Sequence, residues 1–127
     1  QLMTKGTNEI ILDAYNANPS SMKVAIENFL FLDKKNKTLF LGDMFELGNE
    51  SLAEHKGVID LLTNQDNIDC YFIGNDFYQN KIIKSNFFFF ENFENFSEAV
   101  KVKKIDNNMI LIKGSRGMAL ERSLELI

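Results

Sequence analysis

The stretch Thr38-Leu39-Phe40-Leu41-Gly42-Asp43 decides the fold class of this 127-residue chain. After its first residue the run is apolar throughout, and it stops abruptly at glycine and aspartate. A short apolar run of this kind, bounded by turn residues, is typical of a strand that is buried on both faces, as in parallel sheets. We therefore expect a parallel sheet covered by helices on both sides.

The same strand-then-helix unit recurs along the rest of the chain. Apolar runs at residues 70–73, 87–90 and 109–112 predict further strands, and the four-phenylalanine run at 87–90 is interpreted as a central strand. Helical periodicity predicts helices at residues 52–62, 76–84, 93–103 and 118–127. Strands that alternate with helices in this way are joined by crossover connections in a parallel sheet.

The first 35 residues add a hairpin and another helix. Residues 1–4 and 9–14 are extended runs on either side of the turn-prone segment 5–8. Asn18 and Pro19 suit the start of a helix, which we expect to close near Lys34 and Lys35. The apolar face of that helix is formed by Met22, Ile26, Phe29 and Leu30. The prediction is one α/β domain over residues 1–127, with a Rossmann-like open, mostly parallel sheet, helices on both faces and an N-terminal antiparallel hairpin strand.

Composition excludes several classes of protein. With 45% hydrophobic and 25% charged residues the chain is globular. One cysteine, Cys70, and one histidine, His55, cannot build a disulfide framework or a tetrahedral metal cage, and Cys70 is expected to be an inert core residue. A net charge of −4 argues against a nucleic-acid partner.

The sequence also carries no signal for a membrane. No apolar stretch reaches the roughly 20 residues of a membrane span, and the amino end lacks a signal-peptide pattern. We expect a cytoplasmic chain without a membrane partner. Because it begins with Gln1 rather than Met, the sequence is compatible with a fragment of a longer protein.

Candidate ligand-binding residues follow the predicted strands. In an open parallel sheet, ligands bind outside the carboxyl ends of the strands. The segments that follow the predicted strands are 13–18, 42–46, 74–75 and 113–117. We expect all four to lie along one edge of the sheet.

The last of these segments, Lys113-Gly114-Ser115-Arg116-Gly117, is the most informative. The chain has 12 lysines but only two arginines, and one of these lies between two glycines. Glycines allow close approach of the backbone, and the cations and the hydroxyl suit a carboxylate or phosphate. The same residues could instead form a tight turn with its cations spread over a helix, and the residues alone leave both interpretations open. The segment is not a Walker phosphate loop.

Four other residues are candidates for a site. Asp13 could accept hydrogen bonds from a ribose or could simply initiate a turn. Asp43 and Glu46 could hold a metal ion or order Lys113. His55 is interpreted as a packed or solvated helical histidine rather than a general base.

At these residues the sequence resembles the carboxyl-terminal domain of the Mur ligases. The resemblance covers nearly the whole chain, and its motifs occur in order at appropriate spacing. It is carried by residues 13–22, 41–48, His55, 112–118 and Glu121. Within the family, the closest likeness is to members that join D-alanyl-D-alanine to UDP-N-acetylmuramoyl-tripeptide in peptidoglycan synthesis.

The resemblance implies an enzyme of three domains. An amino-terminal domain would bind the UDP-sugar, and a central ATPase domain would bind most of the ATP and the Mg²⁺. Both would be absent from this chain, which would be the third domain, closing over the central one in cis. The implied chemistry is activation of the tripeptide carboxylate as an acyl phosphate, followed by attack of the dipeptide amine. The third domain would hold the amine near its target and exclude the water that would otherwise hydrolyse the acyl phosphate.

The resemblance also implies roles for individual residues. The residues that would contact the nucleotide are Asp13, through the ribose, and Tyr15, Asn16 and Asn18. The residues that would face the D-alanyl-D-alanine are Lys113, Ser115 and Arg116. Supporting roles would fall to Asp43, Glu46 and His55. No catalytic residue and no metal ligand is expected within this chain, so the chain alone should be inactive.

Two other classes of protein remain as alternatives. A signalling receiver module has about this length, acidic residues after its early strands and a lysine after its last strand, as Asp13, Asp43 and Lys113 superficially offer. Against it, the first strand ends with a single carboxylate and the third ends in Gly74-Asn75, without a phospho-acceptor. A stand-alone nucleotide- or flavin-binding module would bind its ligand appreciably as an isolated chain.

Overall fold

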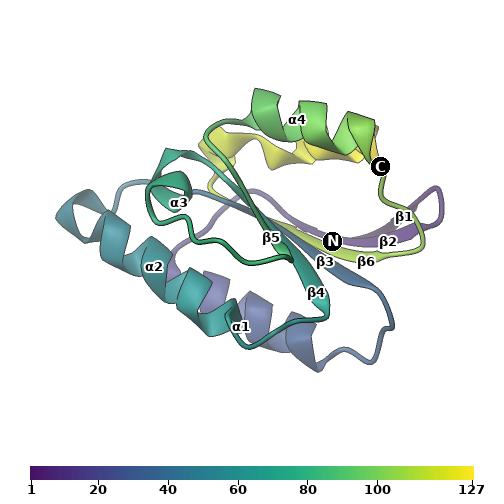
Figure 1. Ribbon diagram of the computed structural model, residues 1–127, viewed down its shortest axis with the longest axis horizontal. Helices are drawn as coiled ribbons and strands as arrows, with labels where there is room; N and C mark the ends of the chain where they lie inside the picture. Colours follow the sequence, from purple (N-terminus) through teal and green to yellow (C-terminus); the bar gives the residue numbers. More distant parts are fainter.

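A six-stranded sheet with helices on both faces forms the centre of the computed structural model, which describes residues 1–127 (Figure 1). The strands are β1 (Leu2–Lys5), β2 (Asn8–Asp13), β3 (Lys37–Gly42), β4 (Ile68–Ile73), β5 (Phe87–Phe90) and β6 (Met109–Lys113). Their order in the sheet is β1-β2-β6-β3-β4-β5, and only β1 runs antiparallel to its neighbour. The predicted fold class and N-terminal hairpin are confirmed.

The helices divide between the two faces of the sheet (Figure 1). The α-helices are α1 (Pro19–Phe31), α2 (Ser51–Leu62), α3 (Asn75–Gln79) and α4 (Phe93–Val102), and the 3₁₀ segments are η1 (Gly48–Glu50), η2 (Arg116–Met118) and η3 (Leu120–Leu126). One face carries α1, α2 and α3, and the other carries α4 and η3. None of these helices has the length and apolar character needed to span a bilayer.

Each central strand contributes to two hydrophobic cores. Leu39 and Leu41 of β3 pack into the core beneath α1 and α2, whereas Phe40 packs into the core beneath α4. All three side chains are fully buried. Because alternate residues of a strand point to opposite faces, a strand with a core on each side must be apolar at every position, which explains the run at residues 39–41.

Three predicted elements differ from the structure. The phenylalanine strand β5 lies at the edge of the sheet, and three of its four residues are only partly buried, so its interpretation as a central strand was wrong. The helix predicted at 76–84 ends at Gln79, and the following Ile82 and Ile83 are exposed. The helix predicted at 118–127 is the 3₁₀ segment η3, which starts after Ala119 in the left-handed conformation.

The first helix begins and ends through side-chain contacts. Asn18 is its N-cap: its Oδ1 accepts from the Ser21 N–H, and the Asn18 N–H donates to Ser21 Oγ. The helix ends at Phe31, short of Lys34 and Lys35, and the cation at its C-terminal end is Lys37 of β3. The N-terminal prediction is confirmed, and the assignment of Lys34 and Lys35 to the carboxyl end was wrong.

Candidate functional site

The loops after three neighbouring strands meet at the carboxyl edge of the sheet. Lys113 at the end of β6 pairs in register with Asp13 at the end of β2 on one side and with Leu41 of β3 on the other. The segments that follow these strands therefore lie side by side. Asp43 and Gly74 lie at the same edge, because the Asp43 N–H donates to the carbonyl of Ile73, the last residue of β4. The prediction that the four segments share one edge is confirmed.

An ion pair links the first of these loops to the last. Lys113 Nζ lies 2.6 Å from Asp13 Oδ2 and donates a second hydrogen bond to the Asn16 carbonyl at 3.1 Å. The Lys113 side chain is only 2% exposed, whereas that of Asp13 is 45% exposed. Asp13 borders an open hollow beside the first turns of α1, of about 600 Å³. The lysine is thus inside the fold and the carboxylate is at its surface.

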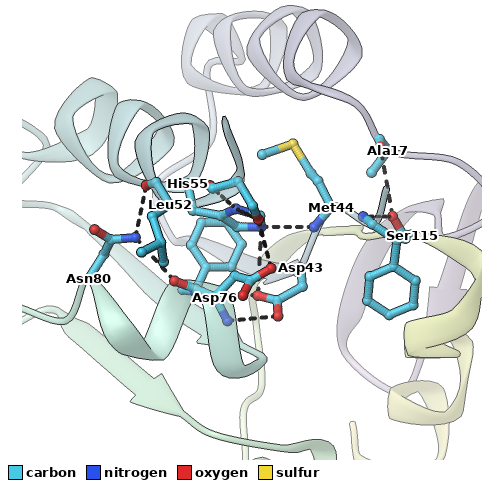
Figure 2. Close-up of polar contacts among 11 residues, drawn as sticks. Ala17, Asp43, Met44, Leu52, His55, Asp76, Asn80 and Ser115 are labelled. Atoms are coloured by element: carbon cyan, nitrogen blue, oxygen red, sulfur yellow. Dashed lines mark hydrogen bonds and ion pairs between the residues drawn. The ribbon is translucent and has the colours of Figure 1, made fainter. Parts of the chain in front are cut away.

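Ser115 ties three loops together (Figure 2). Its Oγ accepts from the Phe45 N–H at 2.8 Å and donates to the Ala17 carbonyl at 3.5 Å. These contacts connect the β6–η2 loop with the loops after β3 and β2. Ser115 is buried, so its hydroxyl is committed to holding the loops in place.

Arg116 is the cation of this corner that is open to solvent. Its guanidinium lies 5.9 Å from the ring centroid of Tyr15, which is also exposed. A cation at this distance from an aromatic ring is attracted to it weakly at a solvated site. Gly117 lies close to Phe45, because a Cβ at this position would lie 2.4 Å from the Phe45 ring, which would have to move aside. The corner therefore presents a planar cation beside an aromatic ring and next to the Asp13 loop.

A buried polar cluster supports the loop after β3 (Figure 2). The Met44 N–H donates to His55 Nε2 at 2.9 Å, and His55 Nδ1 lies 2.6 Å from the Ser51 carbonyl. Because an N–H can only donate and a carbonyl can only accept, we assign the ring proton to Nδ1 and a neutral charge to His55. The ring is fully buried. The interpretation of His55 as a packed helical histidine is confirmed, and its packing fixes the loop.

Asp43 caps the short helix α3. Its two carboxylate oxygens accept the N–H groups of Asp76 and Phe77 at 2.9 and 3.0 Å. Burial raises the pKa of Asp43, and these two N–H groups oppose that rise. The partners of Lys113 are Asp13 and the Asn16 carbonyl, so the alternative in which Asp43 and Glu46 order this lysine was wrong. Glu46 is exposed.

Cys70 is a core residue. It is fully buried on β4, and burial raises the pKa of its thiol to about 12. A thiol with so high a pKa is protonated at neutral pH and is a poor nucleophile. The prediction that Cys70 is inert is supported.

Sequence reasoning singled out the polar residues at this edge of the sheet but missed several of the contacts among them. The pairing of Lys113 with Asp13 and the Asp43 cap of α3 join segments 100 and 33 residues apart in the sequence. The Met44 bond to His55 joins a loop to the helix that follows it. The register of β2 against β6 was the signal that could have paired Asp13 with Lys113, since both residues end neighbouring strands. The remaining contacts depend on loop conformations that carry no periodic pattern.

The chain matches a known family over most of its length. Residues 1–116 match the model described as "Mur ligase, glutamate ligase domain". The chain is 34% identical over 122 residues to the UDP-N-acetylmuramoyl-tripeptide--D-alanyl-D-alanine ligase of Rickettsia prowazekii, with 91% of the chain and 26% of that protein aligned. It is 36% identical over 120 residues to the enzyme of the same name from Bacillus subtilis, with 88% and 26% aligned. The chain thus spans about a quarter of the length of these relatives.

Solved structures share the fold. The MurF ligase of Thermotoga maritima in complex with ADP has a TM-score of 0.78 and 24% identity, with 98% of this chain and 29% of that one aligned. MurF from Acinetobacter baumannii has a TM-score of 0.80 and 23% identity, with 98% and 29% aligned. These structures show the fold, and the match over residues 1–116 shows that the chain belongs to the Mur ligase family, in its glutamate ligase domain.

Proposed function

We propose that this chain is the carboxyl-terminal domain of an ATP-dependent ligase that adds D-alanyl-D-alanine to UDP-N-acetylmuramoyl-tripeptide in peptidoglycan synthesis. Relatives from Rickettsia prowazekii and Bacillus subtilis carry the name of this activity. The observation that carries the proposal is the corner at the sheet edge, where exposed Arg116 lies beside Tyr15 and the Asp13 loop. A nucleotide-facing loop and a carboxylate-binding cation are thereby adjacent.

Arg116 is the group proposed to bind the free carboxylate of the dipeptide. A guanidinium offers a planar fork of N–H donors that matches a carboxylate, and Arg116 is exposed and free to turn toward one. Holding the carboxylate would place the amine at the other end of the dipeptide for attack on the activated tripeptide. Fixing a reactant in this way can lower the barrier by several kcal/mol.

The nucleotide contact is proposed for Asp13, with Tyr15, Asn16 and Asn18 nearby. Asp13 is half-exposed at an open hollow, and the three neighbours are exposed on the same loop. A carboxylate beyond a strand end is suited to accept hydrogen bonds from ribose hydroxyls. ATP would be the co-substrate that activates the tripeptide carboxylate.

The residues of this chain do not fit a magnesium site. No group of three histidine, cysteine or acidic side chains gathers anywhere in the structure, and both oxygens of Asp43 already accept backbone N–H groups. We therefore assign Mg²⁺ and the phosphates to a central ATPase domain in cis and derive no step through the metal on this chain. A cytoplasmic location is part of the proposal, and the lone, buried, free Cys70 is consistent with a reducing compartment.

The experiment that tests the proposal uses the longer protein that carries this chain. The purified protein is incubated with ATP, MgCl₂, UDP-N-acetylmuramoyl-tripeptide and either D-alanyl-D-alanine, D-alanine or D-glutamate. The masses of the products are measured by mass spectrometry. We expect the pentapeptide product with the dipeptide and none with D-alanine or D-glutamate alone. If a single amino acid is added as readily as D-alanyl-D-alanine, the chain belongs to another branch of the family. If no amino component gives a product, the proposal is refuted.

A further inference from the structure

We propose that Lys113 is a positioning residue for Asp13 and does not itself contact the dipeptide. The resemblance to the family placed Lys113 among the dipeptide-facing residues, and the geometry points to a different role. The inference rests on the proposed function, because it concerns how the nucleotide-facing carboxylate is held.

The first argument is burial. The side chain of Lys113 is 2% exposed, although it stands at the end of β6 where the neighbouring Arg116 loop is open to solvent. An ammonium group taken out of water needs acceptors to offset its desolvation. Lys113 has two of them, Asp13 Oδ2 at 2.6 Å and the Asn16 carbonyl at 3.1 Å. The ammonium group of Lys113 therefore binds the loop that begins at Asp13, and it does so from inside the fold.

The second argument is that the two carboxylate oxygens of Asp13 differ in their hydrogen bonding. Oδ2 is held by Lys113, while Oδ1 accepts no hydrogen bond within the chain. The Asp13 side chain is 45% exposed and borders the open hollow beside α1. One oxygen thus anchors the carboxylate and the other remains available to a ligand.

The third argument is that Lys113 also fixes the backbone of the loop. Its bond to the Asn16 carbonyl lies between Asp13 and the helix cap at Asn18, whose Oδ1 accepts from Ser21. Both ends of the loop are thereby anchored, Asp13 through the ion pair and Asn18 through the cap. A ligand that bound here would meet a loop already in place, which lowers the entropy cost of binding.

The test compares loss of the lysine with loss of the arginine in the longer ligase. Lys113→Met keeps an unbranched chain of similar size and removes the charge. We expect it to raise the dissociation constant for ADP, measured by calorimetry, about tenfold, as for loss of a charge-assisted hydrogen bond, and to leave the KM for D-alanyl-D-alanine within about twofold. Arg116→Met should do the reverse. Lys23→Met, which removes an exposed charge from α1, is the control and should change neither value.

A double-mutant cycle shows whether Lys113 acts through Asp13. Adding Lys113→Met to Asp13→Asn should weaken ADP binding by much less than Lys113→Met does in the wild type, because the lysine then has no carboxylate to hold and only its bond to the Asn16 carbonyl is lost. Additive losses would overturn the inference, as would a rise in the dipeptide KM of Lys113→Met that matches Arg116→Met. Should Lys113→Met fail to fold, Lys113→Gln retains a donor without charge and enters the same cycle.

The cycle also separates this inference from the proposed function. A longer protein that binds ADP but transfers no D-alanyl-D-alanine would refute the proposed function, and the ADP cycle would still decide the role of Lys113. A wild-type protein without affinity for ADP would overturn the inference, since Asp13 would have no nucleotide to meet.

Discussion

Lys37 shows how one side chain can end a helix from the neighbouring strand. Its Nζ donates to the carbonyls of Phe29, Leu30 and Leu32 at 3.2, 2.9 and 2.9 Å. The last turn of a helix leaves carbonyls without donors from its own helix. Here the Phe29 carbonyl also accepts from the Leu32 N–H and the Leu32 carbonyl from the Lys34 N–H, and Lys37 adds a charged donor to all three carbonyls. A cation here also complements the negative end of the helix dipole.

Replacement of Lys37 by methionine should therefore destabilise the domain. We expect Lys37→Met to lower the free energy of unfolding by about 1–2 kcal/mol, because three partly buried carbonyls at the end of α1 lose a charged donor. Urea denaturation followed by circular dichroism measures the change. Lys35→Met removes an exposed charge and should stay within about 0.5 kcal/mol of the wild type. Equal losses in both variants would contradict the role of Lys37.

The raised pKa of Asp43 predicts how the stability of the domain depends on pH. Burial raises its pKa in the folded chain above the ordinary value of 3.8. A carboxyl group whose folded pKa is raised contributes stability that is complete below pH 3.8 and is lost as the pH rises through the folded pKa. The stability of the wild type relative to Asp43→Asn should therefore fall as the pH rises from 3.8 through the folded pKa of Asp43, and should become constant above that pKa.

The measurement is a series of urea denaturations of both proteins between acidic and neutral pH. Comparison at each pH cancels the titration of the other carboxylates, which both proteins share. A wild-type advantage that grows with rising pH would mean that the two N–H bonds lower the pKa of Asp43 more than burial raises it.

At the scale of elements, glycine is required at one position of the fold and only tolerated at another. Gly74, between β4 and α3, has φ +131°, and a Cβ there would lie 2.3 Å from the Asp43 carboxylate. Gly57, within α2, has open space where a Cβ would be. Gly74 leaves room for Asp43 to reach the N-terminus of α3. Gly57 fills no such need, and it only increases the conformational entropy that the unfolded chain loses on folding.

Alanine at the two glycines should have opposite effects. Gly74→Ala should cost about 3 kcal/mol or more, because the conformation and the contact both exclude a Cβ. Gly57→Ala should raise the stability by about 0.5–1 kcal/mol through helix propensity. Thermal and urea unfolding of the two variants check both signs, and a neutral Gly74→Ala would contradict the geometry at Asp43.

Elements with a strong hydrophobic pattern were predicted well, and the exceptions have physical reasons. Residues 118–127 repeat apolar side chains at helical spacing, but the two fully buried residues of η3, Leu120 and Ser123, are three residues apart, while Leu124, Leu126 and Ile127 are partly buried. That spacing is the period of a 3₁₀ helix. The left-handed Ala119 before it separates η3 from η2, and nothing in the residue type announces this conformation.

At the scale of the whole molecule, topology assembles the candidate site. The order β2-β6-β3 places the carboxyl ends of three strands together, although Asp13 and Lys113 are 100 residues apart in the sequence. The shared edge could be predicted, because parallel strands all end on one side. Which residues are buried there could not be predicted. Lys113 and Ser115 look like ligand contacts in the sequence, yet both are held inside the fold.

The chain alone should not turn over ATP. It has no Walker loop and no cluster of acidic side chains for a metal ion, so it lacks the groups that transfer a phosphoryl group. We expect phosphate release from ATP by the purified 127-residue chain to equal the background without protein. Hydrolysis that increases in proportion to the concentration of the chain would contradict a purely positioning domain.

The central claim is that Arg116 binds the incoming dipeptide while the Asp13 loop meets the nucleotide. The most direct measurement is the steady-state kinetics of Arg116→Ala in the longer ligase, with ATP and D-alanyl-D-alanine varied in turn. The account predicts that the KM for the dipeptide rises by about tenfold or more, while the KM for ATP stays within about twofold. Equal increases in both constants, or an increase for ATP alone, would contradict it.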